Sequence, residues 1–134
     1  MNELSGKVVI VTGAAGNLGQ AVAQALGRAG AQRVLADRSS DRLAKLYPTT
    51  GAEPLLIGDT DFTREEAVAQ MVKTALGRFG RIDALVNTIG GFTGGKPVHE
   101  DDLDSWDRML AINLRTTLLA CRAVIPAMIA QGSG

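Results

Sequence analysis

Lys7-Val-Val-Ile-Val-Thr-Gly-Ala-Ala-Gly-Asn-Leu-Gly19 is the stretch of sequence that decides the fold. Its first part, residues 7–12, is an almost continuous run of β-branched residues, which is typical of a parallel strand covered on both faces. Glycines follow at positions 13, 16 and 19, and apolar residues then recur at helical spacing at Leu18, Ala21, Val22, Ala25 and Leu26. The stretch therefore predicts a buried strand, a tight glycine turn and a helix, in that order.

The rest of the chain repeats this alternation. Strands are expected at residues 33–37, 53–57 and 83–87, and helices at residues 40–47, 63–79 and 103–130. Thr63 to Glu66 has the pattern of a capping box at a helix start, and Pro126 is expected to bend or loosen the last helix. Four strands that alternate with helices specify a parallel sheet with right-handed crossovers. The predicted fold is a Rossmann-type, doubly wound α/β domain with the partial strand order 3-2-1-4.

Composition limits the class of partner. The chain has 134 residues, enough for one domain, and its 14 Lys and Arg balance its 14 Asp and Glu, so no net charge draws it to nucleic acid or an anionic membrane. Cys121 is the single cysteine, which excludes an internal disulfide framework. The start lacks a signal-peptide pattern, and no run reaches the roughly 18 apolar residues of a membrane span. We expect a cytoplasmic protein without nucleic-acid or membrane partners.

The glycine turn lies where the N-terminus of a helix would meet an anion. Gly13, Gly16 and Gly19 let the backbone turn tightly and approach a pyrophosphate. Asp37 ends the next strand, where a carboxylate can accept hydrogen bonds from an adenosine ribose and would repel a 2′-phosphate, so NAD is favoured over NADP. Arg38 could stack on adenine or meet a 2′-phosphate. The simpler alternatives are that the glycines form a turn needed only for packing, and that Arg38 is a solvated side chain at the start of a loop.

Four motifs of the chain occur together in a characteristic order: Thr12-Gly-Ala-Ala-Gly-Asn-Leu-Gly19, Asp61-Phe62-Thr63, Asn87-Thr-Ile-Gly90 and Asn113. With these motifs the chain resembles the short-chain dehydrogenase/reductase family. The resemblance covers essentially the whole chain. It implies an NAD(P)-dependent oxidoreductase that transfers a hydride between nicotinamide and an alcohol or carbonyl substrate.

The resemblance also implies roles for individual residues. Those implied to bind the cofactor are Thr12, Gly13, Gly16, Asn17, Leu18, Gly19, Asp37, Arg38, Asp61, Phe62, Asn87, Ile89 and Gly90. Asp61 would accept a hydrogen bond from the adenine amine while Phe62 packs nearby, or it would simply cap the following helix. Asn113 would hold a water in the proton relay to a catalytic lysine, or it would be a buried asparagine with its hydrogen bonds satisfied.

The chain departs from the family pattern in the glycine turn and after the fourth strand. The family usually has a glycine where Asn17 stands and does not need Gly16, so the turn has the spacing of the extended branch while the rest resembles the shorter branch. Asparagine tolerates positive φ, so the turn is expected to survive. Thr88 and Ile89 stand where the family has asparagine and alanine; Thr88 keeps a hydroxyl, and Ile89 is larger.

The residues that do the family's chemistry are not in the chain. In the family a serine, and a tyrosine followed four positions later by a lysine, come after the next strand. The only tyrosine, Tyr47, has Gly51 at that spacing and is expected to be a packing residue. Gln131-Gly-Ser-Gly134 resembles the turn before the fifth strand. We expect one NAD(P)-binding domain over residues 1–134, truncated before the fifth strand and inactive alone.

Two other functions stay open at this point. A non-catalytic dinucleotide-binding module or redox sensor would keep the glycine turn and Asp37 without the tyrosine and lysine. A Rossmann domain for a flavin or S-adenosylmethionine would share the turn, but the motifs at residues 61, 87, 90 and 113 argue against it. No metal site is expected, because His99 and Cys121 each stand alone.

The last predicted helix carries apolar residues on more than one face. They are Leu110, Leu114, Leu118, Leu119, Val124 and Ile125. One face of a sheet would not bury all of them. The helix is therefore predicted to form a homo-dimer or homo-tetramer interface.

Overall fold

The computed structural model describes residues 3–48, 51 and 53–134. It contains one parallel sheet with the order β3-β2-β1-β4. The strands are β1 (Val8–Thr12), β2 (Gln32–Ala36), β3 (Leu55–Ile57) and β4 (Ala84–Asn87). The predicted strands and their order are confirmed.

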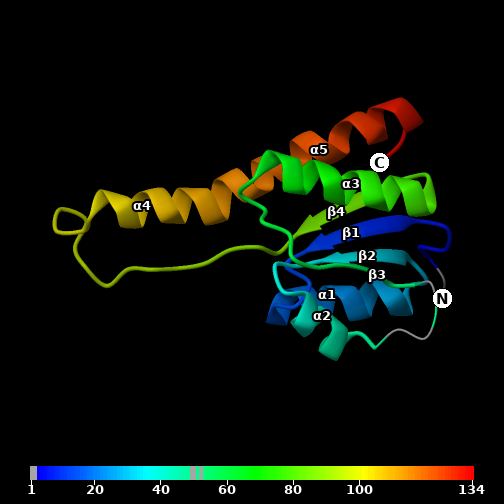
Figure 1. The fold of residues 1–134 in the computed structure, drawn as a ribbon, viewed down its shortest axis with the longest axis horizontal. Helices are drawn as coiled ribbons and strands as arrows, with labels where there is room; N and C mark the ends of the chain where they lie inside the picture. The colour runs from blue at the N-terminus through cyan, green and yellow to red at the C-terminus, as the bar shows by residue number, and fades with distance from the viewer. Residues whose placement is uncertain (1–2, 49–50, 52) are drawn as a thin grey trace.

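Helices cover both faces of the sheet. They are α1 (Asn17–Arg28), α2 (Ser40–Leu46), α3 (Glu65–Phe79), α4 (Leu103–Leu110), a π-helical turn η1 (Ala111–Arg115) and α5 (Thr116–Gln131). Figure 1 shows α1 and α2 on one face and α3 and α5 on the other. The doubly wound α/β architecture is confirmed.

The core consists of two layers separated by the sheet. Val8 and Ile10 of β1 pack with α3 and α5, whereas Val9 and Val11 pack with α1 and α2. This alternation follows from the pleat, which sends successive side chains to opposite faces. All of β1 is buried, which explains why its sequence is apolar at every position up to Thr12.

Helix α1 buries only part of the stripe expected from its sequence. Val22 and Leu26 pack against the core, whereas Leu18, Ala21 and Ala25 are exposed. Its buried residues are Gly19 and Ala23, while Leu18 is 64% exposed. A Cβ at Gly19 would lie 2.1 Å from the carbonyl oxygen of Gly13, so the helix packs directly on the turn before it. This contact fixes the rotation of α1 and leaves Leu18 facing outward.

The capping box predicted from Thr63 is wrong. Helix α3 begins at Glu65, and its N-cap residue, Arg64, makes no side-chain cap bond. The Thr63 hydroxyl instead donates to Asp61 Oδ1 at 2.6 Å. Thr63 is therefore held in the loop before the helix, because the Asp61 carboxylate binds both its hydroxyl and its backbone N–H.

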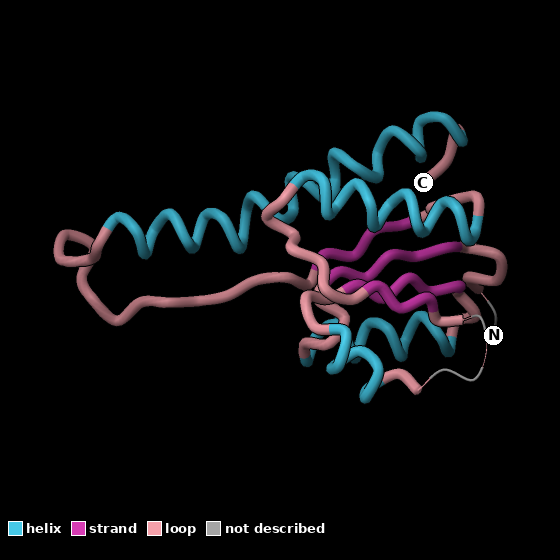
Figure 2. The backbone as a smooth tube through the Cα atoms, viewed as in Figure 1, coloured by secondary structure: helices cyan, strands magenta, loops and turns pink. Residues whose placement is uncertain are grey.

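The last helix is continuous over Leu103–Gln131, as the sequence predicted, but it contains a π-helical turn in its middle. The π-helical turn η1 lies between α4 and α5, and α5 continues through Pro126 to Gln131. Figure 2 shows that α4 and the long loop between β4 and α4 extend away from the sheet. By length and composition the stretch Leu103–Gln131 could cross a membrane. One such helix is weak evidence for a membrane span, because the core helix of a soluble protein can have the same length and composition.

Candidate functional site

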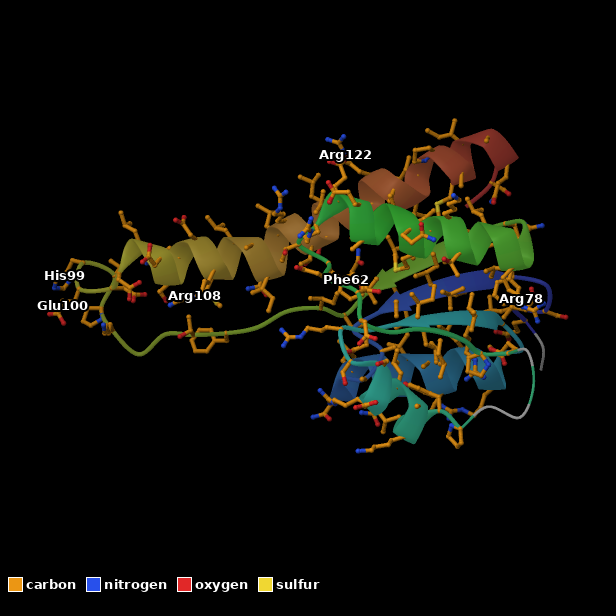
Figure 3. The ribbon with its side chains drawn as sticks, viewed as in Figure 1. Phe62, Arg78, His99, Glu100, Arg108 and Arg122 are labelled. Atoms are coloured by element: carbon orange, nitrogen blue, oxygen red, sulfur yellow. The ribbon has the colours of Figure 1, made fainter. Side chains whose placement is uncertain are left out.

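The carboxyl ends of the four strands meet at one edge of the sheet, and two cavities open there. Their volumes are about 370 Å³ and about 760 Å³, within the usual size range of ligand sites. The residues common to both cavities are Arg38, Phe62, Ile89 and Ile112. Figure 3 places Phe62 at this edge, between the sheet and the helical layer of α3. Ligands of doubly wound folds bind at such an edge.

The glycine turn lies beside the smaller cavity. Gly13 has a left-handed φ of 73°, and a Cβ there would lie 2.9 Å from Thr88 Oγ1. Gly13 and Gly16 line the cavity. Helix α1 begins without a side-chain cap and without an acidic residue in its first turn. Its first N–H groups are thus suited to an anion.

Asn17 does not need the positive φ considered for it from the sequence. It is the first residue of α1, and Asp59 is the one non-glycine residue with positive φ among those that the structure describes. The turn therefore tolerates Asn17 because this position is helical.

Asp37 connects the end of β2 to the glycine turn. Its carboxylate is part of a residue only 7% exposed. Oδ2 accepts from the backbone N–H of Ala15 at 3.0 Å, and Oδ1 accepts from that of Ser39 at 3.2 Å. A carboxylate has about four acceptor positions, so Asp37, which lines the smaller cavity, keeps capacity for a ligand hydroxyl.

Asp61 and Phe62 line the larger cavity. The hydrogen bonds from the Thr63 hydroxyl and N–H lower the pKa of Asp61 below its ordinary value. Asp61 therefore stays an ionised acceptor at neutral pH, while Phe62 is buried. The alternative that Asp61 caps the following helix is wrong, because its carboxylate binds Thr63 in the loop and not the first turn of α3.

Three polar residues join β1 to β4 beneath the turn. The hydroxyl of Thr12 donates to Asn87 Oδ1 at 2.9 Å. The hydroxyl of Thr88 donates to the carbonyl oxygens of Thr12 at 2.8 Å and Gly13 at 3.1 Å. The hydroxyl that Thr88 keeps thus fixes the base of the glycine turn.

Asn113 lies in η1 and binds the loop that follows β4. Its Nδ2 donates to the carbonyl oxygens of Gly91 and Met109, both at 2.9 Å, and its Oδ1 accepts from the Gly91 N–H at 3.1 Å. The residue is exposed, so the alternative of a buried asparagine is wrong, although its amide is satisfied within the chain.

The structure brings eight of the sequence-predicted site residues to the two cavities. These are Gly13, Gly16, Asp37, Arg38, Asp61, Phe62, Ile89 and Gly90. The other predicted residues line neither cavity: Thr12, Asn17, Leu18, Gly19, Asn87 and Asn113.

Sequence reasoning missed several residues that line the cavities. Ser39 and Arg42 line the smaller one, and Arg108, Ile112 and Thr116 line the larger one. Their positions in the sequence could have indicated them. Ser39 and Arg42 lie two and five residues after Asp37, at the N-cap and in the first turn of α2, and Ile112 and Thr116 lie on either side of Asn113.

Two residues predicted to be outside the site remain outside it. His99 is exposed and lies 3.5 Å from Glu100 at the far end of the extended loop (Figure 3). Cys121 is half-buried in α5. Over residues 3–48, 51 and 53–134, no group of three His, Cys, Asp or Glu side chains is placed to hold a metal ion.

Comparison with known proteins agrees with this geometry. A family model described as short chain dehydrogenase matches residues 7–134. An uncharacterized oxidoreductase of Staphylococcus aureus (strain MRSA252) is 34% identical over the whole chain, which spans 58% of that relative. The solved structure of NAD+-bound xylitol dehydrogenase has a TM-score of 0.89 at 34% identity, over 98% of this chain and 52% of that one. A metagenomic short-chain oxidoreductase in complex with NADP has a TM-score of 0.86 at 36% identity, over 98% and 61%.

Proposed function

This chain belongs to the short-chain dehydrogenase family, and from that premise we propose that it binds NAD(P) at the carboxyl edge of its sheet. We propose further that the whole protein transfers a hydride between nicotinamide and an alcohol or carbonyl carbon of a small-molecule substrate. The observation that carries the proposal is the placement of the glycine turn and Asp37 around one cavity at the N-terminus of α1.

The residues of the site fit such a cofactor. The uncapped start of α1 would hold the pyrophosphate, and Asp37 would accept from the adenosine ribose. Asp61 and Phe62, in the larger cavity, would hold the adenine. When bound, the cofactor would supply a carbon that accepts or donates hydride, and the part of the protein is to bind and orient it.

We propose NAD as the preferred form. The charge of Asp37 faces the cavity where the ribose would lie, and it would repel a 2′-phosphate. Arg38 and Arg42 line the same cavity and would reduce that repulsion. One of the similar solved structures holds NAD+ and another holds NADP. In this chain, the preference between the two cofactors would depend on the balance of charge among Asp37, Arg38 and Arg42.

The catalytic step is proposed to need residues outside this chain. The chain spans 58% of its curated relative, and Tyr47 is not followed by a lysine at the family's spacing. We therefore propose that residues 1–134 are the cofactor-binding domain and are inactive alone. The rival is a non-catalytic dinucleotide-binding module or redox sensor. A reading frame that continues into Tyr-x-x-x-Lys would support the dehydrogenase, and one without it would support the module.

The partner proposed for the last helices is a second copy of the protein. The large apolar side chains exposed along α4, η1 and α5 are Leu103, Trp106, Leu110, Leu114, Leu118, Ile125 and Ile129. They include four of the six residues from which an interface was predicted, whereas Leu119 and Val124 are buried. An exposed apolar stripe of this length favours association. We propose a cytoplasmic homo-dimer or homo-tetramer.

Cofactor binding is tested by titrating the protein with NADH and NADPH and following nucleotide fluorescence. Gly19→Ala should weaken binding by at least about 10-fold, the loss expected when the backbone of an anion site must shift by a bond length. Gly77→Ala is the matched control, because a Cβ there meets nothing within 4 Å. Circular dichroism checks that both variants are folded. A folded wild-type protein that binds neither nucleotide would refute the proposal.

A further inference from the structure

Tyr47, which the sequence suggested was a packing residue, makes a specific hydrogen bond to the glycine turn. It lies at the C-terminal end of α2, half-buried against the core layer that contains α1. Its hydroxyl donates to the carbonyl oxygen of Ala14 at 2.7 Å. Burial raises the pKa of Tyr47 above its ordinary value. The hydroxyl is therefore protonated, and a donor, throughout the neutral range.

The same peptide group connects this hydroxyl to Asp37. The carbonyl of Ala14 and the N–H of Ala15 belong to one peptide unit, and that N–H donates to Asp37 Oδ2 at 3.0 Å. The hydroxyl, the peptide and the carboxylate thus form a continuous chain of hydrogen bonds. In such a chain each bond polarises the next, so a donor on the carbonyl strengthens the N–H as a donor.

The next carbonyl of the turn, that of Ala15, is held by side chains from both α1 and α2. A terminal nitrogen of Arg42 donates to the carbonyl oxygen of Ala15 at 2.8 Å. Gln20 Nε2 donates to the same oxygen at 3.1 Å. Two side chains of the α2 segment, Tyr47 and Arg42, therefore hold two successive carbonyls of the turn, and Gln20 of α1 shares the second one.

We propose that Tyr47 is a positioning residue for the adenosine ribose, which acts through the Ala14–Ala15 peptide to fix the Asp37 carboxylate. The inference rests on the proposed function, because it takes Asp37 as the acceptor for the ribose hydroxyls. Tyr47 does not touch the ligand. It sets the position and acceptor strength of the side chain that distinguishes a free 2′-hydroxyl from a 2′-phosphate.

A side chain that only packs in the core would behave differently. Tyr47→Phe keeps the ring, and with it the apolar contacts, and removes the hydroxyl alone. If the ring were the important part, this variant would bind nucleotides like the wild type. If the hydroxyl fixes Asp37, the variant should lose affinity for NADH more than for NADPH, because a looser carboxylate both accepts less well and repels less directly.

The test is a double-mutant cycle on nucleotide affinity with Tyr47→Phe, Asp37→Asn and the double variant. Tyr47→Phe should raise the Kd for NADH by about 3- to 10-fold, the range for one net hydrogen bond. It should also reduce the preference for NADH over NADPH. In the Asp37→Asn background, the same change should have little further effect, because coupled residues are not additive. Lys45→Ala, an exposed change on α2, is the control and should leave affinity and preference unchanged.

The outcomes separate the two levels of inference. A wild-type protein that binds neither nucleotide would overturn both the proposed function and the role of Tyr47. A wild-type protein that binds NADH while Tyr47→Phe leaves the Kd unchanged, or weakens it equally in both backgrounds, would overturn the role of Tyr47 alone. Thermal unfolding of each variant shows whether a loss of affinity reflects a loss of fold.

Discussion

Asn113 in the π-helical turn and Gly91 in the loop after β4 bind each other through both ends of the asparagine amide. The side-chain Nδ2 donates to the Gly91 carbonyl at 2.9 Å, and the Gly91 N–H donates to Oδ1 at 3.1 Å. This pair attaches the extended loop to the helical layer directly beside the larger cavity, which Ile112 lines.

Asn113→Ala should therefore release the loop. We expect hydrogen exchange at the Gly91 amide to accelerate by about 10-fold, as expected for the loss of roughly one net hydrogen bond. Exchange measured by mass spectrometry on peptides covering residues 88–98 checks this. Thr117→Val is the control, because it removes one hydrogen bond to the Asn113 carbonyl at 3.3 Å without touching the loop. Unchanged exchange at Gly91 would contradict the assigned contact.

Asp37→Asn should reduce discrimination between the two nicotinamide cofactors. The variant keeps the size of the side chain but loses the charge that repels a 2′-phosphate and that accepts from Ala15 and Ser39. The Kd for NADH should rise by about 10-fold or more, in line with hydrogen bonds to a charged acceptor. The Kd for NADPH should change less. Parallel titrations with the two nucleotides give the ratio of the Kd for NADPH to the Kd for NADH. If this ratio were the same in the variant and the wild type, Asp37 would not discriminate between the two cofactors.

Asp83 should control the stability of the sheet in acid. Its side chain, 7% exposed, accepts from Arg81 Nε at 2.8 Å and from the Val8 N–H at 2.9 Å. Chiefly the hydrogen bond from Arg81 holds the pKa of Asp83 well below its usual range. A carboxyl whose pKa is lowered by folding stabilises the protein above the unfolded-state pKa of about 3.9, and this stability is lost as the pH falls toward the lower folded-state pKa.

Asp83→Asn should thus lower the free energy of unfolding by about 1–2 kcal/mol at neutral pH. The variant should also lose less stability than the wild type when the pH falls below about 4. Urea unfolding followed by circular dichroism at several pH values measures both effects. Asp107→Asn, an exposed change on α4, serves as the control. If the free energy of unfolding depended on pH in the same way in the wild type and in Asp83→Asn, Asp83 would not be the source of the acid sensitivity.

Leu118→Glu should disrupt the proposed interface between copies. Leu118 is 55% exposed on α5 and continues the stripe of Leu110 and Leu114. A charge there can reach solvent in a monomer, whereas it would be unfavourable in an apolar interface. Light scattering should show a dimer or tetramer for the wild type and a monomer for the variant. Leu46→Glu, an exposed change on α2, should leave the mass unchanged. A monomeric wild type would refute the interface.

The part of the site that local chemistry specifies could be predicted from the sequence. Gly13 needs its left-handed φ and its missing side chain for reasons contained in one turn. Asp37 follows a strand whose end is defined by its own apolar run. In the same way, the bonds that Asp61 makes with Thr63 span two residues, although the sequence pattern assigned that threonine to the helix cap and was wrong.

The sequence by itself determined the alternation of strands and helices, the buried central strand and the position of the glycine turn, because periodicity and turn preferences act over a few neighbouring residues. Only the tertiary structure decided the contacts that connect distant segments. Tyr47 reaches Ala14 across 33 residues, and Thr88 reaches Thr12 across 76. Such pairs form only when the crossover helices pack on the sheet, and the direction in which each helix presents its side chains depends on the core beneath it.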